Sequence, residues 1–153
     1  MSYVAAVLQP GERVRAVGHL HWVIFLRAIL LAATGFAVLA LARELAPRIK
    51  DAADIAGWIV LALALLAFLH AWFQRSITEL AVTNRRVIYK RGFLRRHTVE
   101  MNMDKVETVD VDQSVAGRLL GFGSIRVQGT GQGIENLNRV AAPLRLRNAI
   151  TAR

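Results

Sequence analysis

The chain has 153 residues, a formal net charge of +9, 54% hydrophobic residues and no cysteine. The length suits one ordinary domain, and the lack of cysteine excludes a disulfide framework and thiolate chemistry. From residue 74 onward the cations are not interleaved with an aromatic platform, because the aromatic residues there are Tyr89, Phe93 and Phe122. We therefore expect no nucleic-acid partner.

Two long apolar segments follow a short lead of residues 1–21. Residues 22–42 carry one charge, and residues 55–73 carry none. At about 1.5 Å of rise per residue each segment reaches roughly 30 Å, the thickness of a hydrocarbon core. We therefore expect a transmembrane helical hairpin over residues 22–73. A soluble hairpin is the alternative, but too few residues remain to cover two helices that are apolar on all sides.

The orientation of the hairpin is expected from the lysines and arginines near its ends. The loop at residues 43–54 balances its cations with acids, whereas Arg13 and Arg15 precede the first span and many cations follow the second. We therefore expect both termini in the cytoplasm. The expected interfacial anchors are Trp22, Arg27, Trp72 and Arg75, with Arg27 reaching back to the interface from within the span.

From residue 76 the apolar residues recur with a period of two, which is typical of strands. Strands are expected at residues 76–83, 86–91, 96–103, 107–113, 124–129 and 136–142, and short helices at residues 114–121 and 143–151. The first of these helices has Ser114 as its N-cap and Gly121 as its terminator. The expected fold class is α+β: a transmembrane α-helical hairpin, followed over residues 76–153 by a mostly antiparallel β domain with a C-terminal helix.

Several motifs together resemble one family. They are ELAVTNRRVIYKRG at residues 79–92, MDKVETVDVDQSVAGRLLGFGSIRVQGTG at residues 103–131, LQPGE at residues 8–12, and His21-Trp22 before the first span. This combination resembles the bacterial PH-like domains flanked by membrane helices, over nearly the whole chain. The resemblance implies a strongly bent antiparallel sheet, usually of seven strands, capped by a C-terminal helix. It also implies a one-domain, two-span architecture, and it does not imply an enzyme, because the family has no recognised catalytic residues. We therefore expect a non-catalytic protein of the bacterial inner membrane.

Residues 81–96, AVTNRRVIYKRGFLRR, concentrate cations shortly after the second span. Eukaryotic PH domains bind phosphoinositides with basic residues around their first hairpin, to which this stretch is loosely similar. Contact with lipid head groups is therefore expected at Arg85, Arg86, Lys90, Arg95 and Arg96, with Arg85 and Arg86 best placed for the membrane. Two simpler explanations stay open: the positive-inside bias, and the solvent-facing side of alternating strands.

Other motifs carry weaker chemical signals. GTGQG at residues 129–133 lies between two strands with no lysine or helix behind it, so a hairpin tip is expected rather than a phosphate loop. His19 and His21 lack the further ligands that a metal site needs. Asp110 and Asp112 share one strand face, as the polar residues of a half-buried strand do. We expect no metal, no cofactor and no catalytic residues.

Three functions stay open. The first is a non-catalytic scaffold or interaction module, anchored at the cytoplasmic face of a bacterial inner membrane. Its partners would be membrane lipids and an unidentified membrane or cytoplasmic protein, including a second copy of itself. The second is a sensor of anionic lipid head groups that uses the basic first hairpin. The third is a subunit of an oligomeric channel or transporter, which the scarcity of polar residues in the spans disfavours.

Overall fold

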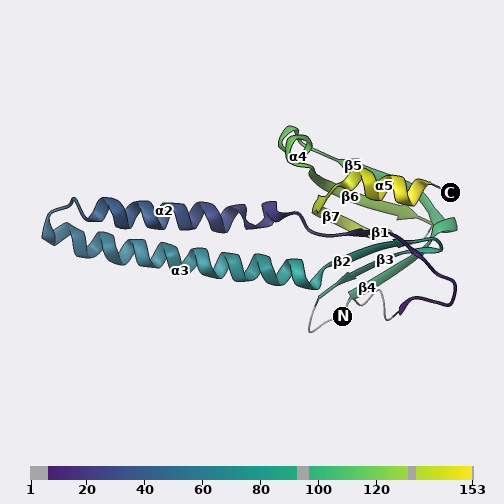
Figure 1. Ribbon diagram of the computed structural model, residues 1–153, viewed down its shortest axis with the longest axis horizontal. Coiled ribbons are helices and arrows are strands. Elements are labelled where there is room, and N and C mark those ends of the chain that lie inside the picture. The colour runs from purple at the N-terminus through teal and green to yellow at the C-terminus, as the bar shows by residue number, and fades with distance from the viewer. Residues whose placement is uncertain (1–6, 93–96, 131–133, 153) are drawn as a thin grey trace. The chain divides into compact units, whose positions relative to one another are not determined.

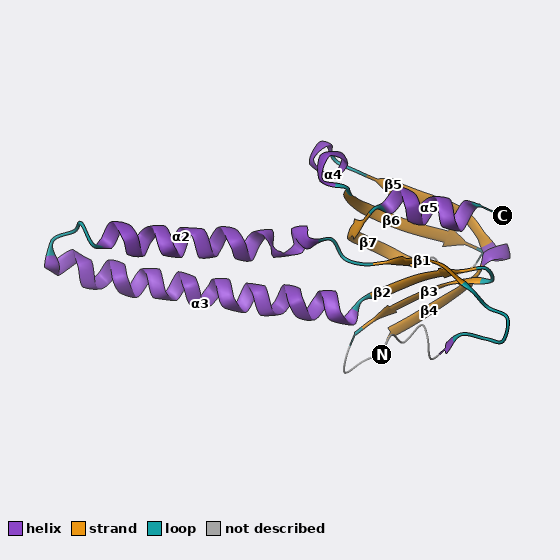
Figure 2. Cartoon of the chain, viewed as in Figure 1, coloured by secondary structure: helices purple, strands orange, loops and turns teal. Residues whose placement is uncertain are grey.

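The computed structural model describes residues 7–92, 97–130 and 134–152. The chain divides into two compact units. The sheet unit comprises Met1–His21 and Arg75–Arg153, and the hairpin unit comprises Trp22–Gln74. Figure 1 and Figure 2 show their helices and strands. The sheet unit is therefore built from two stretches of chain that lie on either side of the hairpin in the sequence.

The sheet unit contains two antiparallel sheets, of four and three strands, in the order β1-β2-β3-β4 and β5-β6-β7. The strands are β1 (Val14–Gly18), β2 (Glu79–Thr83), β3 (Arg86–Arg91), β4 (His97–Asn102), β5 (Val106–Asp112), β6 (Phe122–Gly129) and β7 (Ile134–Ala141). The helices are the short η2 (Met103–Lys105) and α4 (Val115–Leu120), and the C-terminal α5 (Pro143–Thr151).

The predicted order, a hairpin followed by the β domain, is wrong because the first strand comes before the hairpin. Val17 of β1 lies opposite Ala81 of β2, and Gly18 lies opposite Leu80. The apolar residues of β1 therefore find their partner more than sixty residues later in the chain. The hairpin is an insertion between two neighbouring strands of one sheet, and residues 14–18 are its first strand.

The core of the sheet unit consists of apolar side chains from both sheets and from α5. Its buried residues are Leu80, Val82, Val87, Tyr89, Met101, Ile125, Val127, Leu137, Val140, Leu146 and Ile150. Leu146 and Ile150 stand four residues apart, so one face of α5 packs against both sheets. Such a core requires strands in which every second residue is apolar and a helix with one apolar stripe.

The end of β1 joins the two sheets. Leu20 forms a bridge with Val140 of β7, and the Ala141 N–H donates to the His19 carbonyl at 3.0 Å. The His21 N–H donates to the Arg139 carbonyl at 2.7 Å, and Arg139 has a positive φ of 59°. This irregular backbone lets β7 pair with β6 on one side and with the end of β1 on the other.

The strand directions give the sheet unit two distinct ends. We call the end with residues 18–21 and 78–80 the exit end, because the chain leaves there toward the hairpin and returns. The opposite end, with the β2–β3 turn at residues 83–86, is the far end. Leu80 lies opposite both Gly18 and Tyr89, so β3 runs back from the far end to the exit end. Position along the strands therefore decides which side chains lie near the chain exit.

The hairpin unit consists of η1 (Trp22–Phe25), α2 (Leu26–Ala42) and most of α3 (Pro47–Ile77). Two segments, Trp22–Ala42 and Ile49–Ile77, are long and apolar enough to cross a membrane, each with a mean hydropathy of 2.3. The predicted spans lie within these helices, although α3 extends beyond residues 55–73 at both ends. Most large apolar side chains of the two helices are exposed, as is expected of a surface that faces lipid.

Small residues spaced by seven line the contact between the two helices. The buried positions are Ala28, Gly35 and Ala42 in α2, and Gly57, Ala64 and Ala71 in α3. A Cβ atom on Gly35 would come within 2.8 Å of the Leu61 side chain, and one on Gly57 within 2.6 Å of Leu39. Each glycine therefore receives a leucine from the other helix, which allows a close antiparallel pair.

Candidate functional site

A Pro-Gly turn before β1 positions an acidic side chain at the far end of the sheet unit. The Glu12 N–H donates to the Gln9 carbonyl at 2.9 Å, which closes a turn over Pro10 and Gly11. Gly11 has a φ of +79°, which glycine adopts without strain, and proline favours the position before it. The Gln9 N–H also donates to Glu12 Oε2 at 2.9 Å. The LQPGE motif thus holds the Glu12 carboxylate in one place.

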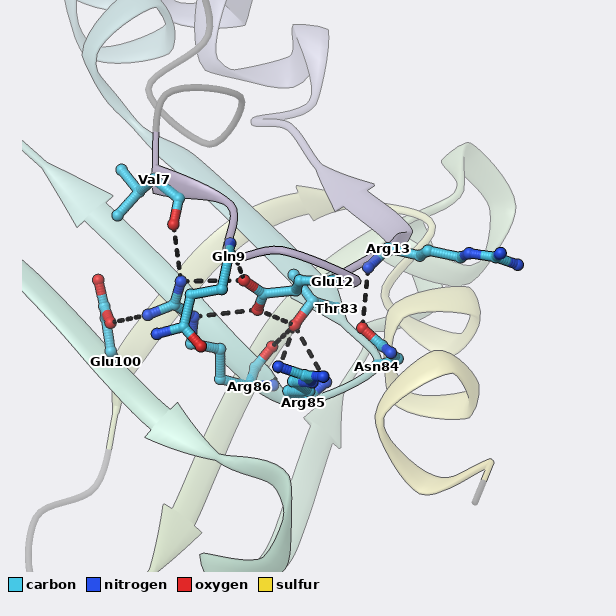
Figure 3. Close-up of polar contacts among 9 residues, drawn as sticks. All are labelled: Val7, Gln9, Glu12, Arg13, Thr83, Asn84, Arg85, Arg86 and Glu100. Carbon is cyan, nitrogen blue, oxygen red and sulfur yellow. Dashed lines mark hydrogen bonds and ion pairs between the residues drawn. The ribbon is translucent and has the colours of Figure 1, made fainter.

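The Glu12 carboxylate binds Arg86 through two parallel hydrogen bonds (Figure 3). Arg86 Nε donates to Glu12 Oε1 at 3.0 Å, and Arg86 Nη2 donates to Oε2 at 3.0 Å. The Glu12 side chain is fully buried, and the Arg86 side chain is 11% exposed. This bidentate geometry is the strongest that a carboxylate and a guanidinium can form.

The guanidinium of Arg86 has two further partners. Nη1 donates to Glu100 Oε2 on β4 at 2.6 Å, and Nη2 donates to the Val7 carbonyl at 2.8 Å. The Thr83 hydroxyl lies 2.7 Å from Glu12 Oε1 and 2.8 Å from the Arg86 carbonyl, and its single proton serves one of these acceptors at a time. We call Glu12, Thr83, Arg86 and Glu100 the far-end clamp.

The clamp changes the acid–base properties of its members. The hydrogen bonds from Arg86 lower the pKa of Glu12 from 4.5 to about 2, although burial opposes the change. The same pair raises the pKa of Arg86 above its ordinary value. Both groups are therefore charged throughout the physiological range, and the clamp is a permanent ion pair that does not take up or release protons there.

A second contact closes the far end beside the clamp. The Arg13 N–H donates to Asn84 Oδ1 at 2.9 Å, and the Asn84 N–H donates to the Arg13 carbonyl at 3.1 Å. The Met103 N–H donates to the Arg85 carbonyl at 2.9 Å. The β2–β3 turn is therefore held from both sides, by the segment before β1 and by the segment after β4.

The structure separates the residues predicted to contact lipid. Arg86 belongs to the far-end clamp, and Arg85 lies exposed beside it in the β2–β3 turn. Lys90 lies opposite Glu79 at the exit end and is half-buried. Arg95 and Arg96 fall outside the described residues. Because β2 runs away from the chain exit, Arg85 and Arg86 lie about one strand length from it despite their nearness in the sequence.

The predicted anchors lie at the ends of the hairpin helices. Trp22 begins η1, and Arg27 is the second residue of α2. Trp72 and Arg75 lie in the last turns of α3, and all four side chains are exposed. Their role at a membrane interface stays a prediction.

The described ranges contain no cluster of three or more His, Asp or Glu side chains that could hold a metal ion. Asp110 and Asp112 are both exposed on β5, while the valines between and beside them turn inward. The GTGQG motif falls largely on residues 131–133, outside the described ranges. Every buried side-chain polar atom in the described part has a hydrogen-bond partner, so none there is held ready for a ligand.

Glu12 is the functional candidate that the sequence analysis missed. Its partner Arg86 is 74 residues away, so no local pattern pairs them. The available signal was the Pro-Gly-Glu turn itself, because a turn that ends in an acid directly before a strand places that acid at the end of a sheet. The arginines of residues 81–96 gave the complementary signal.

Two antiparallel sheets closed by a C-terminal helix define a PH-like domain, here with a helical hairpin inserted after its first strand. The family model described as Bacterial PH domain matches residues 16–152, from within β1 to the end of α5. The chain therefore belongs to the bacterial PH domain family, which confirms the resemblance drawn from its motifs. Comparisons with curated proteins and with solved structures gave no match.

Proposed function

We propose that this protein is a non-catalytic interaction module, and that its hairpin anchors it at the cytoplasmic face of a bacterial inner membrane. The pairing of β1 with β2 carries the proposal, because these strands precede and follow the hairpin. If the two apolar helices cross a bilayer, both connections must emerge on the same side for this sheet to form. The domain then has two covalent links to its anchor, and the excess of cations in it favours the cytoplasmic side.

The partner site that we propose is the pair of open sheet edges. β4 and β5 stand at the edges of their sheets, and no further strand pairs with either within the described ranges. An edge strand offers unpaired N–H and C=O groups, which an extended segment of another protein or of a second copy can bind. The family match is compatible with this non-catalytic role.

Photocrosslinking in native membranes tests the edge proposal. A photoreactive side chain at Thr108, on the β5 edge, is compared with one at Gln128, its cross-strand neighbour on the central strand β6. Both residues are exposed, so they differ mainly in their distance from the open edge. We expect a discrete adduct from position 108, with either another protein or the same chain, and none from position 128. Equal labelling of the two positions, or no adduct at either, contradicts the proposal.

A second candidate function is recognition of anionic lipid head groups at the exit end. The register supports it, because Arg91 at the end of β3 lies opposite His97 at the start of β4, and both lie toward the exit end. Lys90 is the last residue but one of β3 and lies at this end, whereas Arg85 lies at the far end. The predicted contacts Arg95 and Arg96 come between β3 and β4 in the sequence. Cations near an anionic surface contribute about 1 kcal/mol each, and their effect is reduced by salt.

Lipid co-purification separates the two groups of cations. The full chain is extracted from bilayers that contain phosphatidylglycerol and phosphatidylcholine, and the retained lipid is measured by mass spectrometry. We expect the triple variant Lys90→Ala, Arg95→Ala and Arg96→Ala to lose its enrichment in phosphatidylglycerol, while Arg85→Ala keeps it. An equal loss in Arg85→Ala, or unchanged enrichment in the triple variant, contradicts this second candidate.

A further inference from the structure

The short helix α4 displays apolar side chains to the surroundings of the sheet unit. Val115 is 86% exposed and Leu119 is 85% exposed. These residues are four apart, so they share one face of the helix. Leu120 is also exposed, and Arg118 places a cation beside them. Figure 1 shows α4 projecting beyond the ends of β5 and β6. An apolar pair that is almost fully exposed at such a tip indicates a surface that another phase or molecule covers.

The backbone of α4 is held firmly, so this exposure is a fixed feature of the fold. Ser114 caps the helix, because its hydroxyl accepts the Gly117 N–H at 3.1 Å. Gly121 ends the helix with a φ of +78°, the left-handed conformation that favours glycine. A Cβ atom on Gly117 would lie 2.6 Å from the Phe122 carbonyl oxygen, so the helix rests directly on the start of β6. The side chain of Gln113 also donates to that carbonyl at 3.0 Å.

Contacts within the sheet unit place α4 at the exit end. The ring of Phe122, which follows α4, stacks on the ring of His21 with their centroids 5.4 Å apart. His21 is the last residue before the apolar segment that begins at Trp22. Leu119 precedes Phe122 by three residues, a chain path of at most about 11 Å. The apolar pair is therefore close to His21, the last residue of the sheet unit before the hairpin in the sequence.

The charges around α4 favour an anionic surface. Residues 113–125 contain Arg118 and no acidic residue, while Asp112 precedes this stretch at the end of β5. An arginine beside exposed valine and leucine suits the boundary of a bilayer, where the side chain reaches the head groups while its apolar neighbours enter the acyl region. Exposure of these valine and leucine side chains to water would not stabilise the domain.

We propose that α4 inserts Val115 and Leu119 into the interface of the bilayer that holds the hairpin, with Arg118 at the level of the head groups. This inference rests on the proposed membrane anchoring. The insertion would give the sheet unit a third attachment to the membrane besides its two connections to the hairpin. Because α4 joins β5 to β6 in the three-stranded sheet, whereas both connections belong to β1 and β2 of the four-stranded sheet, the three together would restrict how the domain tilts on the surface.

Site-directed fluorescence on the full chain tests the insertion. The chain has no cysteine, so single cysteines can be introduced one at a time and labelled with an environment-sensitive dye. The positions are Leu119→Cys on α4, Gln128→Cys toward the far end of β6, and Leu63→Cys on an exposed face of α3. Each labelled protein is reconstituted into vesicles of phosphatidylglycerol and phosphatidylcholine, with and without lipids that carry a quencher in the acyl chain.

We expect lipid quenching at positions 119 and 63 and none at 128. Quenching at 63 with none at 119 overturns the insertion of α4 and leaves the anchoring intact. No quenching at 63 overturns the anchoring, and the insertion falls with it. A blue shift at 119 without lipid quenching also overturns the insertion, because it shows that protein, such as a second copy, covers α4.

Discussion

At the scale of single residues, Arg86 illustrates how a basic side chain is used inside a domain rather than on its surface. Its guanidinium donates to two carboxylates and one backbone carbonyl, so a lipid phosphate could bind it only by displacing them. Glu12 depends on Arg86 in the same way, because its carboxylate is fully buried. Removing one partner of such a pair leaves a buried charge without compensation, which costs more than the intact pair contributes.

The substitution Glu12→Gln is therefore expected to destabilise the sheet unit by about 3 kcal/mol. For a chain of this size that lowers the unfolding midpoint by roughly 6–12 °C. The measurement is far-UV circular dichroism of the full chain in detergent micelles. Glu107→Gln, an exposed carboxylate on β5, is the control and is expected to leave the midpoint almost unchanged. Equal midpoints for the two variants would show that the clamp contributes nothing.

The lowered pKa of Glu12 predicts an acid-dependent loss of stability. The pKa is about 2 in the folded protein and 4.5 ordinarily, so the unfolded chain takes up the proton first as the pH falls. The stabilisation is therefore complete above about pH 4.5 and disappears as the pH falls through about 2. In unfolding curves from pH 7 to pH 2, the gap between the parent chain and Glu12→Gln should be constant down to about pH 5 and then shrink. A gap that widens in acid contradicts this assignment.

At the scale of elements, small residues line the contact between the two hairpin helices, whereas large apolar side chains cover their outward faces. The buried small positions recur every seven residues in both helices, and the leucines opposite the glycines fill the space that these leave. The small faces are thus occupied within the hairpin itself. The side chains on the outward faces of the two helices are almost entirely apolar. These faces therefore do not supply the polar lining that a channel needs.

Gly57→Leu is expected to separate the two hairpin helices, because any Cβ at this position would collide with Leu39 at 2.6 Å. Ala56→Leu, one residue earlier and exposed, is the matched control. Trp22, Trp58 and Trp72 all lie in the hairpin unit, so tryptophan fluorescence during thermal unfolding reports on this unit. We expect a midpoint lower by roughly 2–12 °C for Gly57→Leu alone, since overpacking costs about 1–3 kcal/mol. Identical midpoints for both variants would mean that the glycine contact is unimportant.

Most local structure could be predicted from the sequence, because period and caps are local signals. β3 and α5 begin and end at the predicted residues, and Ser114 caps α4 as expected. β1 could not be assigned to the sheet, because five alternating residues do not show that their partner lies beyond the hairpin. The two long apolar helices were predicted from hydropathy, but their seam of small residues spaced by seven was not.

The candidate site was predicted less well than the fold. Arg85, Arg86 and Lys90 form one cluster in the sequence, whereas the register places the first two at the far end and the third at the exit end. The number of residues from a helix is a poor guide to distance in space here, because β2 leads the chain to the far end and β3 returns it to the exit end. The exposed Val115 and Leu119 were also missed, because an amphipathic period does not reveal that an apolar face lacks a covering partner.

At the scale of the whole molecule, the chain is one PH-like domain whose first two strands precede and follow an apolar hairpin in the sequence. Such a domain cannot complete its sheet unless both connections to the hairpin lie in the same compartment, because Val17 and Ala81 pair across the insertion. In the proposed anchoring, the edges of the two sheets and the tip at α4 would face partners and the lipid surface from a fixed base. Anchoring with this topology is the central claim, since the other proposals depend on it.

Cysteine accessibility in oriented membrane vesicles tests that claim most directly. Single cysteines replace Arg13 before the hairpin, Glu44 in its loop and Gln128 after it, and an impermeant reagent is added to right-side-out and inside-out vesicles. We predict labelling of positions 13 and 128 from the cytoplasmic side alone, and of position 44 from the opposite side alone. Labelling of all three from one side would show that the hairpin does not cross the membrane. Labelling of 13 and 128 from opposite sides would contradict the joined sheet.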